Sequence, residues 1–188
     1  MSVEIKTATP DRWSDLVAVF GRRGSDPSWC WCRRFLGDSE PGEDNREALR
    51  REVADASVPP GLLAYIDERP VGWTRVGLRS EFPGVIGNRA LSRVLTDDPG
   101  AWWVTCFVVD SRHRQSGVGT ALLHAAVAFA RDHGATALEG HPVDVTNLSA
   151  ARVSGSAIFT GTMAMFSAAG FLEIGRTYPS RPVMKRLV

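Results

Sequence analysis

The chain has 188 residues, of which 44% are hydrophobic and 23% are charged, and its formal net charge is +1. This length suits one domain with a substantial core, and such an average composition argues against disordered and membrane-embedded classes. A charge this close to zero argues against nucleic acid as a partner. We therefore expect a single domain over residues 1–188.

Two further features bear on location and redox state. No apolar run follows a basic stretch at the N-terminus, and no segment approaches the ~20 apolar residues that span a bilayer, so we expect a cytoplasmic protein without a membrane partner. The cysteines, Cys30, Cys32 and Cys106, are odd in number and accompany no secretory signal, which argues against a disulfide framework. We expect reduced thiols.

The N-terminal third predicts a strand followed by two helices. Val3 to Thr7 alternates like a strand, and Pro10 then opens a helix whose apolar residues recur at helical spacing as far as Phe20. A loop rich in Trp, Cys, Gly and Pro runs from about Gly24 to Glu43, and a second helix is expected over Asn45 to Ala56.

The middle of the chain predicts a hairpin and an insertion. Leu62 to Ile66 and Val71 to Val76 are β-rich runs separated by the polar connection Asp67-Glu68-Arg69-Pro70. Arg79 to Gly100 is polar and interrupted by Gly and Pro, with a short helix expected at Ala90 to Leu95.

The second half alternates between strands and helices. Trp102 to Val109 is the most strand-like run, and apolar spacing from Val118 to Phe129 predicts a helix that stops at His133-Gly134. The remaining elements are expected to be a strand at Thr136 to His141, a short helix at Met163 to Ala169, and strands at Phe171 to Arg176 and Val183 to Leu187. The order predicts a mixed α/β fold.

The loop between the strand ending at Val109 and the next helix has the character of a phosphate site. Backbone N–H groups gather there at the positive end of a helix, Gly117 and Gly119 remove side chains, and Arg112 and Arg114 add positive charge. The alternative is that the two glycines only permit a tight turn. A P-loop is excluded because no Gly-Lys-Ser/Thr follows, and the dinucleotide fingerprint fails on glycine spacing.

Arg114-x-x-Gly117-x-Gly119 after a strand, followed by Ala121-Leu122-Leu123, resembles the acetyl-CoA signature of the GNAT superfamily of N-acetyltransferases. Downstream, the run from Met165 to Phe171 resembles that superfamily's later segment, which usually reads Tyr, three residues, then Gly-Phe. The chain also looks like a bacterial branch with a Trp-Cys-rich early segment.

The resemblance implies a GNAT fold whose mixed sheet splays after the strand that ends at Val109, with acetyl-CoA as co-substrate and its pantetheine in the gap. It also implies transfer of an acetyl group to a primary amine, here expected to belong to a small molecule. The cofactor-binding residues that follow are Phe107, Val108, Val109, Arg112, Arg114, Gln115, Ser116, Gly117, Val118, Gly119, Thr120 and Phe166. The sequence leaves room for a homodimer.

The chain departs from the superfamily pattern at Phe166, where the acid that protonates the departing CoA thiolate is often Tyr. Because a thiol of pKa ~8.5 is a fairly good leaving group, solvent or the Ser167 hydroxyl is an alternative proton source.

Two polar residues are candidates for the base that accepts the amine proton. Glu139 and His141 lie two apart on a predicted strand, so their side chains should share a face, and Asp144 follows shortly after. Carboxylates on this sheet often serve as the base in the resembled superfamily, which favours Glu139 slightly. An ordinary polar strand face is the alternative.

The segment Trp29-Cys30-Trp31-Cys32-Arg33-Arg34-Phe35 has three interpretations. Packing of its aromatic residues against the core is favoured, the lining of an acceptor pocket comes second, and a metal site comes last because C-x-C lacks the usual ligand spacing. We expect no bound metal. A nucleophilic role for Cys106 is disfavoured because no adjacent base is evident.

Three other functions stay open on sequence grounds. A non-catalytic CoA-binding sensor is suggested by Phe166 and by the absence of an unambiguous base. A protein amine is an alternative acceptor, although nothing in the sequence announces a peptide partner. An unrelated phosphate-binding protein follows if the later Gly170-Phe171 match is chance.

Overall fold

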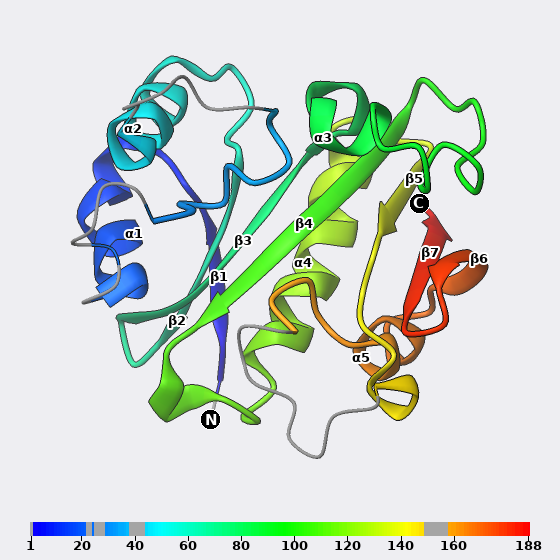
Figure 1. Ribbon diagram of the computed structural model, residues 1–188. Helices are drawn as coiled ribbons and strands as arrows, with labels where there is room; N and C mark the ends of the chain where they lie inside the picture. The colour runs from blue at the N-terminus through cyan, green and yellow to red at the C-terminus, as the bar shows by residue number, and fades with distance from the viewer. Residues whose placement is uncertain (1, 22–23, 25–28, 38–43, 149–157) are drawn as a thin grey trace.

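The computed structural model describes residues 2–21, 24, 29–37, 44–148 and 158–188, so part of the predicted Gly24 to Glu43 loop lies outside the described residues. Helices surround one seven-stranded sheet (Figure 1). The strands are β1 (Glu4–Thr7), β2 (Gly61–Ile66), β3 (Arg69–Leu78), β4 (Ala101–Val109), β5 (Ala137–Gly140), β6 (Leu172–Tyr178) and β7 (Arg181–Leu187). The α-helices are α1 (Trp13–Phe20), α2 (Asn45–Asp55), α3 (Pro83–Ile86), α4 (Val118–Asp132) and α5 (Met163–Ala168).

The sheet is mixed, with the order β1-β2-β3-β4-β5-β7-β6. The β4–β5 pair is parallel and the five other adjacent pairs are antiparallel. Parallel neighbours need a crossover, and α4 supplies it between β4 and β5. The predicted mixed α/β class is confirmed.

Most predicted elements are present within one or two residues of their expected bounds, and two expectations need correction. Ala90 to Leu95 forms successive turns rather than a helix, and the Asn88 side chain accepts hydrogen bonds from the backbone of Ala90 and Leu91 at its start. The insertion's short helix is α3 instead. In the hairpin, only Asp67 and Glu68 form the turn, both with positive φ, and Arg69-Pro70 already belongs to β3.

Each face of the sheet has its own apolar core. Alternate residues of β2 separate cleanly, because Leu62 and Ala64 pack with α4 while Leu63 and Tyr65 pack with α1 and α2. The α1 side also holds Trp31, which is fully buried and stacks on Phe20 with ring centroids 4.3 Å apart. The predicted core packing of the Trp-Cys segment is confirmed for Trp31 but not for Trp29, which is 37% exposed.

The sheet divides at the middle of β4. A bulge at Thr105 interrupts the pairing with β3, since Arg75 is opposite Cys106 and Val76 is opposite Val104. The pairing of β4 with β5 ends at Val104 and Gly140, and beyond that level the two strands diverge (Figure 1). The splay that the resemblance implied is present, and it begins at Val104, five residues before the end of β4.

The expectation of three reduced thiols is wrong for this structure. Cys32 and Cys106 form a disulfide, while Cys30 is free. The number of cysteines does not determine how far apart they lie, and here Cys32 packs beside Cys106 of β4 in the α1-side core. Cys106 is therefore not available as a nucleophile while this bond is intact.

No helix in the described part of the chain is both long and apolar enough to cross a membrane.

Candidate active site

The start of α4 is an exposed, left-handed turn with free N–H groups. Gly117 is the N-cap with φ 84°, and no side chain caps the helix. Gln115 also has positive φ, at 61°, and the residues from Arg114 to Gly117 are exposed. A 15-residue helix without a side-chain cap presents its first N–H groups and its positive dipole end to solvent, which suits an anion.

The two arginines that sequence analysis assigned to this loop differ in their surroundings. Arg112 forms a 2.7 Å ion pair with Asp110, whose pKa is lowered to about 2 by the hydrogen bonds from Arg112. The guanidinium of Arg114 is exposed and has no hydrogen bond or ion pair with another described residue. Arg114 is therefore the guanidinium that a phosphate can recruit without breaking an existing ion pair.

Gly119 lies where the first turn of α4 meets α5. A Cβ at this position would lie 3.3 Å from Sδ of Met165, which is tighter than most real Cβ contacts. A larger side chain has to turn toward the exposed loop. Glycine at this point keeps the backbone N–H groups of the first turn accessible.

The edge of β4 beyond the splay already has a partner. The N–H of Phe107 donates to the carbonyl of Phe159 at 2.6 Å, while Val108 and Val109 pair with Trp73 and Gly72 of β3. Phe159 thus occupies one of the β4 backbone donors that the resemblance assigned to pantetheine. Any ligand that uses this N–H has to replace the Phe159 carbonyl.

Phe166 packs between β4 and β5 at the level where the two strands diverge. Its side chain is fully buried, and its ring lies edge-on to Phe107 and Phe171 with centroids 6.3 Å and 4.9 Å away. A Cβ on Gly140 would approach the Phe166 ring to 2.5 Å, so this glycine makes room for the ring. Ser167, the alternative hydroxyl, is exposed.

Glu139 is completely buried between two cations. One carboxylate oxygen accepts from Arg79 at 2.7 Å, and the other lies 3.4 Å from Nζ of Lys185. Lys185 also pairs with Asp98 at 3.0 Å, so the network joins the turn after β3, the loop before β4, β5 and β7. These contacts are those of a structural ion pair.

His141 follows β5 and is half-buried, with both ring nitrogens engaged. Nδ1 lies 3.3 Å from a guanidinium nitrogen of Arg181, which can only donate, and Nε2 lies 2.8 Å from the Thr177 hydroxyl. The assigned tautomer therefore carries its proton on Nε2. Burial and then the charge of Arg181 lower the pKa of His141 to about 4, so the ring is neutral near pH 7.

Asp144 belongs to a separate structural cluster. Its carboxylate accepts from Thr146 and Asn147 and pairs with Arg176 at 2.8 Å. These hydrogen bonds, with that of Thr146 the largest cause and that of Arg176 the next, lower its pKa strongly.

Sequence reasoning did not single out Phe159, Thr160 or Arg181, which the structure brings to the splay. They lie outside the recognised motifs, and they follow the end of β5 by 19 to 41 residues along the chain. The available signal was the position of Arg181 at the start of a strand that pairs with β5, but the pairing itself is long-range.

Comparison with models of known protein families identifies the family of this chain. A family model described as the acetyltransferase (GNAT) family matches residues 28–153, more than half of the chain. The chain belongs to the GNAT family. Members of this family are acetyl-CoA-dependent acetyltransferases, and the predicted superfamily is therefore confirmed.

Solved structures share the GNAT fold at low sequence identity. The GNAT domain of S. lividans PAT is 16% identical, with a TM-score of 0.60 over 99% of this chain and 90% of its own. The aminoglycoside acetyltransferase AAC(6')-Ib in complex with coenzyme A is 18% identical, with a TM-score of 0.59 over 99% and 95%. A histone acetyltransferase HPA2 and related acetyltransferase from Corynebacterium glutamicum is 20% identical, with a TM-score of 0.57 over 100% and 97%. No curated protein sequence matches the chain.

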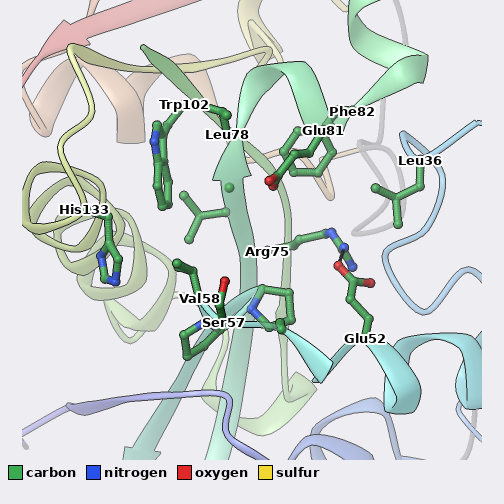
Figure 2. Close-up of a pocket in the computed structure, with 15 residues that line it drawn as sticks. Leu36, Glu52, Ser57, Val58, Arg75, Leu78, Glu81, Phe82, Trp102 and His133 are labelled. Carbon is green, nitrogen blue, oxygen red and sulfur yellow. Dashed lines mark hydrogen bonds and ion pairs between the residues drawn. The ribbon is translucent and has the colours of Figure 1, made fainter. Parts of the chain in front are cut away.

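A cavity of about 480 Å³ lies beside the second half of β3 (Figure 2). It is lined by the last residues of β3 and by the segment just before β2. Trp102 and His133 lie on one side of it, and Arg75, Glu52 and Phe82 lie on the other. His133 is the C-cap of α4, so roughly 22 Å of helix separates the cavity from the start of α4. Arg75 is buried and ion-paired with Glu52, which accounts for most of the charge in this cavity.

The described residues contain no group of three or more His, Cys, Asp or Glu side chains that could hold a metal ion.

Proposed function

We propose that this GNAT protein transfers the acetyl group of acetyl-CoA to a primary amine of a small molecule, by direct attack in a ternary complex. The observation that carries the proposal is the uncapped, exposed start of α4 beside the strand β4, which separates from β5 at Val104. The first feature suits a pyrophosphate, and the second leaves a β4 edge for an extended amide chain.

The chain's own groups suggest how the cofactor is held. The backbone from Gln115 to Thr120 binds the pyrophosphate, and Arg114 adds a mobile positive charge because it has no ion pair with a described residue. The N–H of Phe107 is the donor for pantetheine, and it exchanges the Phe159 carbonyl for the ligand's carbonyl.

In the transfer itself, the amine nitrogen attacks the thioester carbonyl carbon and the carbon–sulfur bond breaks. The nitrogen loses a proton, and the CoA thiolate leaves. Phe166 has no group to protonate the thiolate, so the proton comes from solvent or from the exposed Ser167 hydroxyl. A thiol pKa of ~8.5 makes this adequate without a dedicated acid.

The two predicted bases are not equivalent in their surroundings. Glu139 is fully buried and already neutralises Arg79 and Lys185, so a proton on it would cost two ion pairs. His141 is neutral near pH 7 and partly exposed, but its low pKa makes it a weak base. Both stay predictions. The contacts favour His141 over Glu139, and water that accepts the proton is the alternative.

A CoA-binding protein without turnover is the second candidate, because Phe166 lacks a hydroxyl and both candidate bases are engaged. Calorimetry with acetyl-CoA, CoA and ATP, followed by release of free thiol with a panel of amines, tests both functions. We expect acetyl-CoA and CoA to bind more tightly than ATP, and thiol release to require an amine. Binding without amine-dependent thiol release would favour the second candidate, and equal ATP binding would contradict both.

A further inference from the structure

Arg181, at the start of β7, is a half-buried cation without an acidic partner among the residues that the structure describes. One guanidinium nitrogen donates to the Thr160 hydroxyl at 3.1 Å, and the other lies 3.3 Å from Nδ1 of His141. Both of these partners are neutral. Three of the five N–H groups of an arginine therefore remain for another acceptor.

A second guanidinium lies nearby. Arg34 is exposed, lies over the Phe159 ring at 5.3 Å, and has no ion pair with the described residues. Burial and then the charge of Arg34 lower the pKa of Arg181. Two like charges without a counterion among the described residues oppose each other, and an anion between them would relieve this repulsion.

The hairpin formed by β6 and β7 holds a second arginine, Arg176, whose charge is neutralised by carboxylates of the protein itself. Arg176 on β6 pairs with Asp144 and Glu173, each at 2.8 Å. Glu173 belongs to the hairpin and Asp144 to the loop that faces it, and both carboxylates are already paired with Arg176. Among the described residues, the guanidinium of Arg181 on the adjoining strand bonds to a hydroxyl and an imidazole and to no carboxylate.

The position of the pair links it to the splay of the sheet. Thr160 follows Phe159, whose carbonyl takes the N–H of Phe107 on β4. His141 directly follows Gly140, the last β5 residue paired with β4. The guanidinium of Arg181 thus contacts residues that adjoin both diverging strands.

We propose that Arg34 and Arg181 bind an anionic group, a carboxylate or a phosphate, of the acceptor amine. This rests on the proposed function, and it narrows the acceptor to amines that carry such a group. Arg181 binds the anion through its unused N–H groups, and Arg34 closes over it from the Phe159 ring. Polycationic amines lack that group and are poor acceptors.

The test compares amines that differ only in this group. Glycine, β-alanine, 4-aminobutanoate and phenylalanine are each paired with the corresponding carboxamide, 2-aminoethylphosphonate represents the phosphate class, and kanamycin represents polycationic amines. We expect kcat/KM for the better acids to exceed that of their amides by about 10- to 100-fold, as charged hydrogen bonds produce. The phosphonate arm distinguishes the two anion classes.

Variants assign the preference to the two arginines. Arg181→Gln should remove the preference for acids over amides, Arg34→Gln should reduce it, and Arg181→Lys should restore part of it. Arg131→Gln removes an exposed charge on α4 and is the matched control, which should keep the full preference.

Binding is measured separately from turnover, by ligand-observed NMR with N-acetylglycine and N-acetylglycinamide. We expect N-acetylglycine to bind more tightly, and Arg181→Gln to abolish the difference. Equal behaviour of acids and amides in both measurements, or an acid preference that survives in Arg181→Gln, overturns the proposal. Failure of acetyl-CoA to bind in calorimetry contradicts the proposed function instead, and the NMR titration does not depend on it.

Discussion

The loop before α4 and the polar cluster around β5 place their functional atoms in different ways. In the loop, consecutive residues from Arg114 to Gly119 expose backbone N–H groups, and the conformation depends on Gly117 with its positive φ. Around β5, each polar group is a side chain held by partners from distant segments, as Glu139 is by Arg79, 60 residues away. A loop built from local backbone should keep the fold stable through side-chain changes that would destabilise a buried network.

The largest effect is expected in the buried network. Glu139→Gln leaves Arg79 and Lys185 without their shared carboxylate, and breaking a buried ion pair typically costs ~3–5 kcal/mol of unfolding free energy. Urea denaturation measures it. Glu173→Gln, which removes a more exposed acid, should cost less than ~1 kcal/mol. Unchanged stability with a ~100-fold loss of kcat/KM would instead support Glu139 as the base.

A carboxylate at the start of α4 should abolish acetyl-CoA binding and leave the fold intact. Gly119→Glu places negative charge and bulk at the start of α4, and we expect acetyl-CoA affinity to fall ~100-fold or more, about 2.7 kcal/mol. Calorimetry measures the affinity. His124→Glu adds the same charge on the exposed side of α4 and should bind normally. Normal binding by a folded Gly119→Glu protein would place the phosphate site elsewhere.

The titration of His141 separates the two catalytic candidates. Its pKa of about 4 lies below the ordinary 6.5, so the unfolded chain binds the extra proton, and this group's contribution to stability falls as the pH drops from 6.5 through 4. NMR should find the imidazole titrating near pH 4, and Arg181→Gln should raise that pKa. If His141 is the base, the acidic limb of kcat/KM lies near 4 and disappears in His141→Asn. An acidic limb of kcat/KM near pH 6.5 would contradict the lowered pKa of a His141 base.

A smaller difference is expected between the two loop arginines. Arg114→Gln should weaken acetyl-CoA binding by up to about fivefold, since the loss of an exposed ion pair costs up to ~1 kcal/mol. Arg112→Gln should have less effect because that guanidinium is engaged with Asp110. Calorimetry at two salt concentrations decides, and a larger loss for Arg112→Gln would mean that the Asp110 pair opens on binding.

No effect is expected from chelation, because Cys32 is joined to Cys106 and Cys30 lies in a segment without the usual ligand spacing. Elemental analysis and thermal unfolding with and without chelator provide the measurement. One equivalent of zinc that is lost together with folding would overturn the expectation.

The sequence predicted the loop before α4 but not the side-chain contacts around β5. Apolar spacing identified α4, and the glycines with Arg114 identified the loop, because helix periodicity and turn chemistry act over a few residues. The partners of Glu139 and His141 were not predicted, since they come from β6, from β7 and from the turn after β3. The helix expected at Ala90 to Leu95 does not form. The N–H groups of Ser92 and Leu95 bond four residues back, but these two bonds are not consecutive, so no helix propagates from them.

The disulfide between Cys32 and Cys106 has a consequence for the unfolded chain. It joins residues 74 apart, and the closed loop contains α2, β2 and β3, which together make up much of the α1-side core. In the chain-entropy model, a cross-link of this span removes enough freedom from the unfolded ensemble to stabilise the fold by about 4.5 kcal/mol. The oxidised protein thus begins folding with the N-terminal segment already tethered to the central strand.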